Sequence, residues 1–180
     1  LVPYYTVRNN IDTNISVVNT SSRYVAAFKI RFREGDNSRD ARDFNVYLSP
    51  NDVWTATVTR MPDGDDDPNN DVPVLLSSDM TCTAPILQPI QEMGGRPGIR
   101  FTEIGYNGDS ILAADTSEPS LLTIERAQEG HFEVIGMGVA DPSVSALAAW
   151  AVHTDGPGEP LPPLDCARIS NVIGGTQFVP

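Results

Sequence analysis

Positive charge is scarce in this 180-residue chain, whereas negative charge is not. Twelve arginine and lysine residues stand against 24 aspartate and glutamate residues, which gives a formal net charge of −12, and Lys29 is the one lysine. A protein that binds a phosphate backbone needs clustered basic side chains to displace counterions. The composition therefore argues against a nucleic-acid partner and indicates an acidic surface that repels polyanions and anionic membranes.

Long apolar runs are missing as well. No stretch of about 18 apolar residues occurs, so the sequence predicts no membrane-spanning helix. The chain does not begin with Met, and its opening LVPYYTVRNN has the pattern of a strand rather than of a basic-then-apolar signal peptide. We therefore expect an exported protein whose leader has been removed.

Catalytic motifs are equally hard to find. No serine lies in a G-x-S-x-G turn, and no H-E-x-x-H motif accompanies His131 or His153. Glu125 and Glu133 lie on opposite arms of a predicted hairpin, where they could face each other as glycosidase acids do, although cross-strand surface charges are the commoner explanation. The segment IGMGVAD lacks the third glycine of a dinucleotide site. The sequence therefore predicts a protein that is not an enzyme.

Only two cysteines are present, Cys82 and Cys166. Their separation, without C-x-x-C spacing or neighbouring histidines, argues against a zinc site. In an oxidising compartment the two are expected to form a disulfide. The alternative is a pair of separate buried thiols in a cytosolic protein.

Alternation of apolar and polar residues is abundant. In YVAAFKIRFRE, residues Phe28, Ile30 and Phe32 point one way while Lys29, Arg31 and Arg33 point the other. TNISVV, FNVYLS and VWTATVT alternate in the same manner. Clean alternation is typical of an antiparallel sheet with one solvated face, and such a sheet usually covers its apolar face with a second sheet.

These patterns predict a mainly β protein: one antiparallel β-sandwich domain over residues 1–180, immunoglobulin-like or jelly-roll-like. We expect a loop-rich insertion at about 61–98, where Pro85, Pro89 and Pro97 restrict extended segments to sheet edges. LLTIERAQEGHFEVI predicts a hairpin with its turn at 128–130.

The last third of the chain contains the only helix that the sequence predicts, a short one near 142–152. Asp141 is its expected N-cap, and Pro142 lies in its first turn. A proline-rich connector follows at 154–165. The final residues, ISNVIGGTQFVP, have the pattern of another strand.

The acidic segment MPDGDDDPNND, residues 61–71, is the best candidate for a site. Asp63, Asp65 and Asp67 have the alternate spacing that supplies oxygens to calcium, and with Asp71 they form a candidate metal set. The EF-hand glycine and glutamate positions are absent, however. The alternative is a loop that stays solvated because its charges repel one another.

Two further patterns bear on carbohydrate. Asn14-Ile15-Ser16 and Asn19-Thr20-Ser21 fit the N-glycosylation pattern, although strand-surface polarity explains them equally. Several aromatic residues fall in the first third of the chain and could form a platform for sugar. Phe44 and Trp54, however, alternate in phase with core positions, so we expect them in the core.

The stretch VVNTSSRYVAAFKIRFREGDNSRDARDFNVYLSPNDVWTATV, together with EGHFEVIGMG and the late DCA, resembles a family of exported, β-rich proteobacterial proteins of uncharacterised function. The resemblance covers most of the chain. It implies export and a β-rich fold, and it supplies no catalytic residues.

Taken together, these features predict a secreted or cell-surface structural protein, a subunit of a surface or filamentous assembly held by β-strand contacts. Its expected partners are further copies of itself or other surface proteins. The alternative is a secreted module that binds a glycan or calcium, with calcium as the one candidate cofactor.

Overall fold

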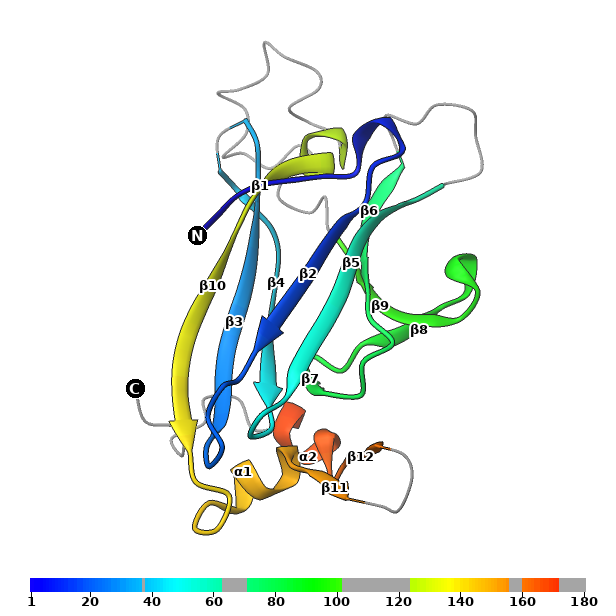
Figure 1. Cartoon of the computed structure of the whole chain (residues 1–180). Helices are drawn as coiled ribbons and strands as arrows, with labels where there is room; N and C mark the ends of the chain where they lie inside the picture. Colours follow the sequence, from blue (N-terminus) through cyan, green and yellow to red (C-terminus); the bar gives the residue numbers. More distant parts are fainter. Residues whose placement is uncertain (37, 63–70, 102–123, 156–159, 172–180) are drawn as a thin grey trace.

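The computed structural model describes residues 1–36, 38–62, 71–101, 124–155 and 160–171 (Figure 1). Two five-stranded antiparallel sheets form the body of the protein. The first contains, in spatial order, β1 (Val2–Thr6), β10 (Glu129–Ala140), β3 (Val25–Glu34), β4 (Asp40–Leu48) and β7 (Cys82–Ala84). The second contains β2 (Thr13–Val18), β5 (Val53–Met61), β6 (Val72–Leu76), β9 (Arg96–Arg100) and β8 (Gln88–Ile90).

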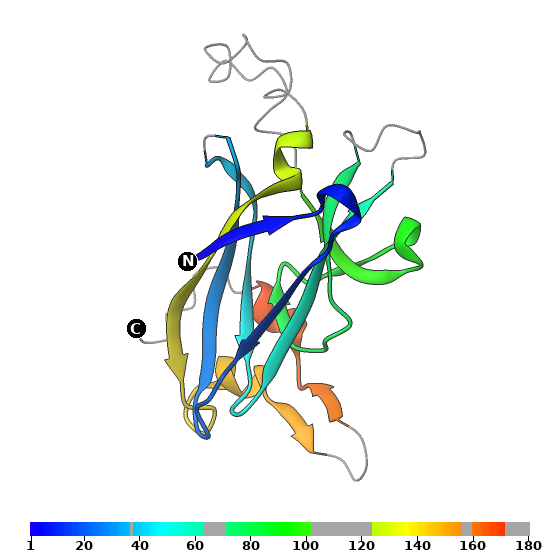
Figure 2. The ribbon, with the colours of Figure 1, turned by 45° about the horizontal axis from the view of Figure 1, so that its top comes forward.

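The two sheets pack face to face, as both views show (Figures 1 and 2). An aromatic core lies between them. Trp54 of the second sheet contacts Phe28 and Phe44 of the first, with ring centroids 6.5 and 5.8 Å apart. Tyr5 and Phe32 pack edge to face at 5.2 Å. The antiparallel β-sandwich and the core position of Phe44 and Trp54 are therefore confirmed.

Strand β3 illustrates why the sequence folds in this way. Phe28, Ile30 and Phe32 are buried between the sheets, whereas Lys29, Arg31 and Arg33 lie on the outer face. There they pair with carboxylates of the two neighbouring strands: Lys29 with Asp43, and Arg33 with Asp40 and Glu133. The alternation thus buries one face and leaves the other charged and solvated.

Two short helices, α1 (Ala146–Ala151) and α2 (Cys166–Asn171), cover one end of the outer face of the first sheet (Figure 1). They form a second apolar cluster with Val25, Ala27 and Tyr47 of that sheet. The small sheet β11 (His153–Asp155) and β12 (Pro160–Pro163) lies between them in sequence. Among the described helices, none is long and apolar enough to cross a membrane.

The predicted helix near 142–152 exists but is shorter, and its expected N-cap is wrong. The cap is Ser145, whose side chain accepts the backbone N–H of Ala148. Asp141 instead accepts both the N–H and the hydroxyl of Ser143 in the turn that precedes the helix. Because the carboxylate of Asp141 is bonded within that turn, it does not cap the helix.

The predicted hairpin at 122–135 is also wrong. Ile124–Gln128, where the first arm was expected to run into the turn, is a 3-10 helix, η5, and β10 pairs with β3 and β1, which are distant in sequence. Four of the five η5 residues are buried, including Arg126, which forms an ion pair with Glu34 at the end of β3. A half-buried strand arm cannot bury consecutive residues in this way.

The segment 61–98 contributes β6, β7, β8 and part of β9. The expected edge position holds for two of its prolines, since Pro89 is in the edge strand β8 and Pro85 follows the edge strand β7. It is wrong for Pro97, because β9 lies between β6 and β8. Pro97 stands opposite Pro89 in β9. Two 3-10 turns, η1 (Arg8–Asn10) and η2 (Gln91–Met93), complete the elements.

The predicted C-terminal strand is wrong at its first residues, 169–171, which are helical. Ile169 lies in helix α2, buried against α1 and the first sheet, because the disulfide at Cys166 holds this segment over the apolar cluster. Residues 172–180 lie outside the described part of the chain.

Candidate functional site: the open edge of strand β10

The acidic segment is described only at its end. Asp63, Asp65 and Asp67 lie outside the described residues. Asp71 is 5% exposed, and its carboxylate lies 3.0 Å from Nε of Arg60. An arginine therefore compensates the charge of Asp71. Within the described residues no group of three or more histidines, cysteines and carboxylates could hold a metal ion.

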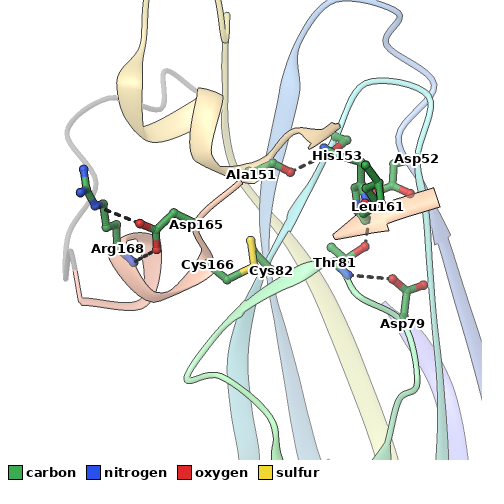
Figure 3. The surroundings of a disulfide bond; sticks show 11 residues. Asp52, Asp79, Thr81, Cys82, Ala151, His153, Leu161, Asp165, Cys166 and Arg168 are labelled. Atoms are coloured by element: carbon green, nitrogen blue, oxygen red, sulfur yellow. Dashed lines mark hydrogen bonds and ion pairs between the residues drawn. A yellow bond between two sulfur atoms is a disulfide. The ribbon is translucent and has the colours of Figure 1, made fainter. Parts of the chain in front are cut away.

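The two cysteines form the predicted disulfide, which joins β7 to the start of α2 (Figure 3). Cys82 is buried. Beside it, Thr81 donates its N–H to Asp79 and its hydroxyl to Asp52. The ring Nδ1 of His153 lies 2.8 Å from the carbonyl oxygen of Leu161. This region fastens the C-terminal helices to the first sheet.

The two glycosylation patterns have different surroundings. Asn19 is buried, and its Nδ2 donates to the carbonyl oxygens of Tyr24, Leu48 and Ser49 at 2.8, 3.2 and 2.7 Å. Attachment of a glycan to that nitrogen would disrupt these bonds, so Asn19 has a structural role. Asn14 is exposed on β2, where its Oδ1 accepts the hydroxyl of Thr57.

Each of the two candidate acids, Glu125 and Glu133, pairs with an arginine of its own. Glu125 on η5 pairs with Arg8, and Glu133 on β10 pairs with Arg33. The two glutamates belong to different elements and do not form the facing pair that a glycosidase needs. The structure therefore supplies no geometry for that chemistry at this pair.

A cavity of about 740 Å³ opens between the sheets, beside β8 and β9. Its walls are mostly apolar, with Arg42 and Arg100 as charged members. Arg42 stands opposite Phe32 on the core side of the first sheet, and burial lowers the pKa of its guanidinium. Two positive groups disfavour a cation here.

Strand β10 has the most unusual surface in the described part of the chain. Along its whole length it pairs with β3, from Gly130 opposite Glu34 to Ala140 opposite Val25. On its other side β1 pairs only with the first residues, and the last pair is Val2 with Phe132. Beyond Phe132, the β1 side of β10 has no strand partner among the described residues.

Apolar side chains line this free length on both faces. Val134, Ile135, Met137 and Val139 are each between 36% and 39% exposed. Val134 stands opposite buried Ile30 on the core side, whereas Ile135 stands opposite Lys29 on the outer side. No charged residue lies between Glu133 and Asp141. Natural edge strands are usually protected by charge or proline, and this one carries neither over its free length.

A bulge at Gly136–Gly138 shapes the edge. The register with β3 shifts between these two glycines, so Met137 is the extra residue. Gly138 has a φ of 151°, a conformation that side chains rarely adopt, and a Cβ at Gly136 would meet nothing within 4 Å. The backbone beside Met137 is therefore open at Gly136.

Ion pairs close both ends of the apolar length. Glu133 lies 3.5 Å from Nε of Arg33, and Oδ2 of Asp141 lies 2.6 Å from Nη2 of Arg23. Hydrogen bonds from the hydroxyl and N–H of Ser143, and then from Arg23, lower the pKa of Asp141 from 3.8 to about 2. The carboxylate of Asp141 is thus stabilised in its charged form.

This shift predicts an acid-sensitive turn after β10. Because the folded-state pKa of Asp141 is depressed, its contribution to stability is complete above pH 3.8 and is lost as the pH falls through about 2. We expect the urea midpoint of the Asp141→Asn variant to fall less steeply between pH 4 and pH 2 than that of the parent protein. Equal slopes in circular dichroism titrations would contradict the assignment.

The sequence pattern predicts the strand in GHFEVI but does not predict its open edge. The signal was available in the composition: apolar residues occupy both parities from Val134 to Val139, with no charge among them. That pattern is expected of a strand covered on both faces. Here the structure leaves those side chains partly exposed.

Comparison with known proteins adds no relative: no family model, curated protein or solved structure matches the chain.

Proposed function

We propose that the protein is an exported, non-enzymatic structural protein, a subunit of a cell-surface or filamentous assembly held by β-strand contacts. The observation that carries the proposal is the free length of β10, with bare backbone and four exposed apolar side chains. Addition of a strand there would pair the backbone groups and bury those side chains together.

Two features support the extracellular part of the proposal. A disulfide persists in oxidising compartments and is rare in the cytosol, and Cys82–Cys166 closes a loop over 84 positions of sequence. The acidic composition, with a net charge of −12, favours solubility outside the cell and disfavours polyanionic partners.

The alternative, a secreted glycan- or calcium-binding module, has less support among the described residues. Asp71 is engaged by Arg60, and the aromatic residues Phe44 and Trp54 are buried rather than displayed. Asp63, Asp65 and Asp67 lie outside the described residues and add no geometry in its favour.

A single charge on the edge tests the proposal. Met137→Lys places an ammonium group where a neighbouring strand would lie, so we expect assembly to weaken by about tenfold or more. Sedimentation velocity and electron microscopy of the purified protein provide the measurement. Val144→Lys is the matched control, because Val144 is 84% exposed in the turn after β10 and makes the same charge change.

A parent protein that stays monomeric without filaments, and that Met137→Lys leaves unchanged, would overturn the proposal. Thermal unfolding of both lysine variants is measured in parallel. Equal melting temperatures show that the loss of assembly comes from the edge and not from unfolding of the sandwich.

A further inference from the structure

The edge strands of the two large sheets are β1, β7, β2 and β8, and β10 forms the edge of the first sheet where its pairing with β1 ends. The edge strand β7 has three residues, and β8 carries Pro89, which cannot donate a backbone hydrogen bond. The outer face of β2 presents polar Asn14 and Ser16 besides exposed Val18, and Ile15 on its other face is buried. Only β10 combines a long free edge with exposed apolar side chains on both faces among the described strands.

The charges around this edge restrict what can dock on it. The protein as a whole carries a net charge of −12, so most approaches of one copy to another are repulsive. At the free length of β10 the charges are locally balanced, since each terminal carboxylate has an arginine partner. A second copy therefore meets little like-charge repulsion there.

The two ends of the free length differ in their exposed charge. At the Asp141 end, the Arg23 side chain is 68% exposed while Asp141 is only 12% exposed, so the accessible charge is positive. At the other end, Glu133 is 34% exposed and faces the outer side of the sheet. Arg33, its partner, is 26% exposed beside it. An antiparallel approach of two identical edges brings the exposed Arg23 of each copy toward Glu133 of the other.

We propose that the occupant of the β10 edge is a second copy of this chain, paired antiparallel through its own β10 about a two-fold axis near Met137. The pairing joins two five-stranded sheets into one continuous sheet. It places Glu133 of one copy opposite Asp141 and its partner Arg23 of the other, twice, because an isologous interface repeats every contact. This inference rests on the proposed function and names its partner.

Charge reversal distinguishes this pairing from other occupants. Arg23→Glu and Glu133→Arg are each expected to raise the dimer dissociation constant by about tenfold, because each creates two like-charge contacts. An equimolar mixture of the two variants restores both contacts in a heterodimer. It should recover the parent dissociation constant to within about threefold. Sedimentation velocity of each variant and of the mixture gives the constants.

Arg168→Glu is the matched control for Arg23→Glu. It breaks the exposed ion pair between Arg168 of α2 and Asp165, which precedes that helix, away from the edge, and should leave dimerisation unchanged. Circular dichroism melting of every variant identifies any that loses its fold. The mixture remains diagnostic in that case, because a locally unfolded variant does not regain affinity from its partner.

The outcomes separate this inference from the proposed function. Restoration by the mixture supports antiparallel β10 pairing. Variants that dimerise like the parent, or a mixture that stays as weak as the single variants, overturn it. If Met137→Lys still abolishes assembly in that case, the proposed function stands and a different strand occupies the edge. A monomeric parent that is insensitive to Met137→Lys removes both.

Discussion

Removal of the Cys82–Cys166 disulfide is expected to lower the free energy of unfolding by about 4.5 kcal/mol in the chain-entropy model. The two cysteines are 84 positions apart, so the cross-link removes much of the freedom of the unfolded chain. In the folded state the bond also holds α2 over the apolar cluster that includes Val25 and Ala27. Urea unfolding of the Cys82→Ala/Cys166→Ala variant measures the loss.

Reductant provides the matched control for this prediction. It should shift the urea midpoint of the parent protein and leave the midpoint of the double alanine variant unchanged. A parent protein whose midpoint does not move after complete reduction, verified by mass, would contradict the expected size of the effect.

Arg126→Met is the second large effect that we expect, a loss of about 3–5 kcal/mol, because it leaves a buried carboxylate without its cation. Arg126 and Glu34 are both fully buried, with Nε 3.1 Å from Oε2. Glu34 also accepts the N–H groups of Asp36 and Arg39, so it organises the loop between β3 and β4. Urea unfolding at neutral pH measures the change.

Two controls accompany Arg126→Met. Arg168→Ala removes an exposed pair and is expected to cost less than about 0.5 kcal/mol. Adding Glu34→Gln to Arg126→Met removes the buried carboxylate charge that Arg126 balances in the parent protein and should recover part of the lost stability. An Arg126→Met variant as stable as the parent would mean that the pair gains no more than its desolvation costs.

Much of the sandwich was predictable because the pattern of its strands is visible in the local sequence. In β3, β4 and β5 apolar side chains alternate with polar ones over strands of 9 to 10 residues, and every buried residue of these strands except Glu34 is apolar. Period two is a property of the extended backbone, so it can be recognised without knowing the partner strand. The disulfide was predictable for a different reason: the chain contains two cysteines, so each has one possible partner within it.

The errors occurred where long-range contacts outweigh local pattern. Ile124–Gln128 has a weak alternation of apolar and polar residues that suggests a strand. In the structure, however, Arg126 forms an ion pair with Glu34, 92 positions away, and the segment is a 3-10 helix. Asp141 has the right position for a helix cap, yet Arg23 and Ser143 occupy its carboxylate. No local window contains those partners.

The candidate site was the least predictable feature. That Val134, Ile135, Met137 and Val139 are apolar is visible in the sequence. That they are exposed depends on where β1 stops along β10, at Val2 opposite Phe132. The end of one strand thus decides whether another, distant in sequence, is covered or open.

By itself the sequence determined the class of the protein: a β-rich, acidic chain with one cross-link and no recognisable catalytic motif. Alternation, charge and cysteine count can be read from the residues themselves, and they do not depend on how the strands are arranged. Only the tertiary structure decided which strand is left open, which arginine neutralises Asp71 and Glu34, and why Asn19 is buried. Those outcomes depend on pairs of residues far apart in the chain, and packing alone brings them together.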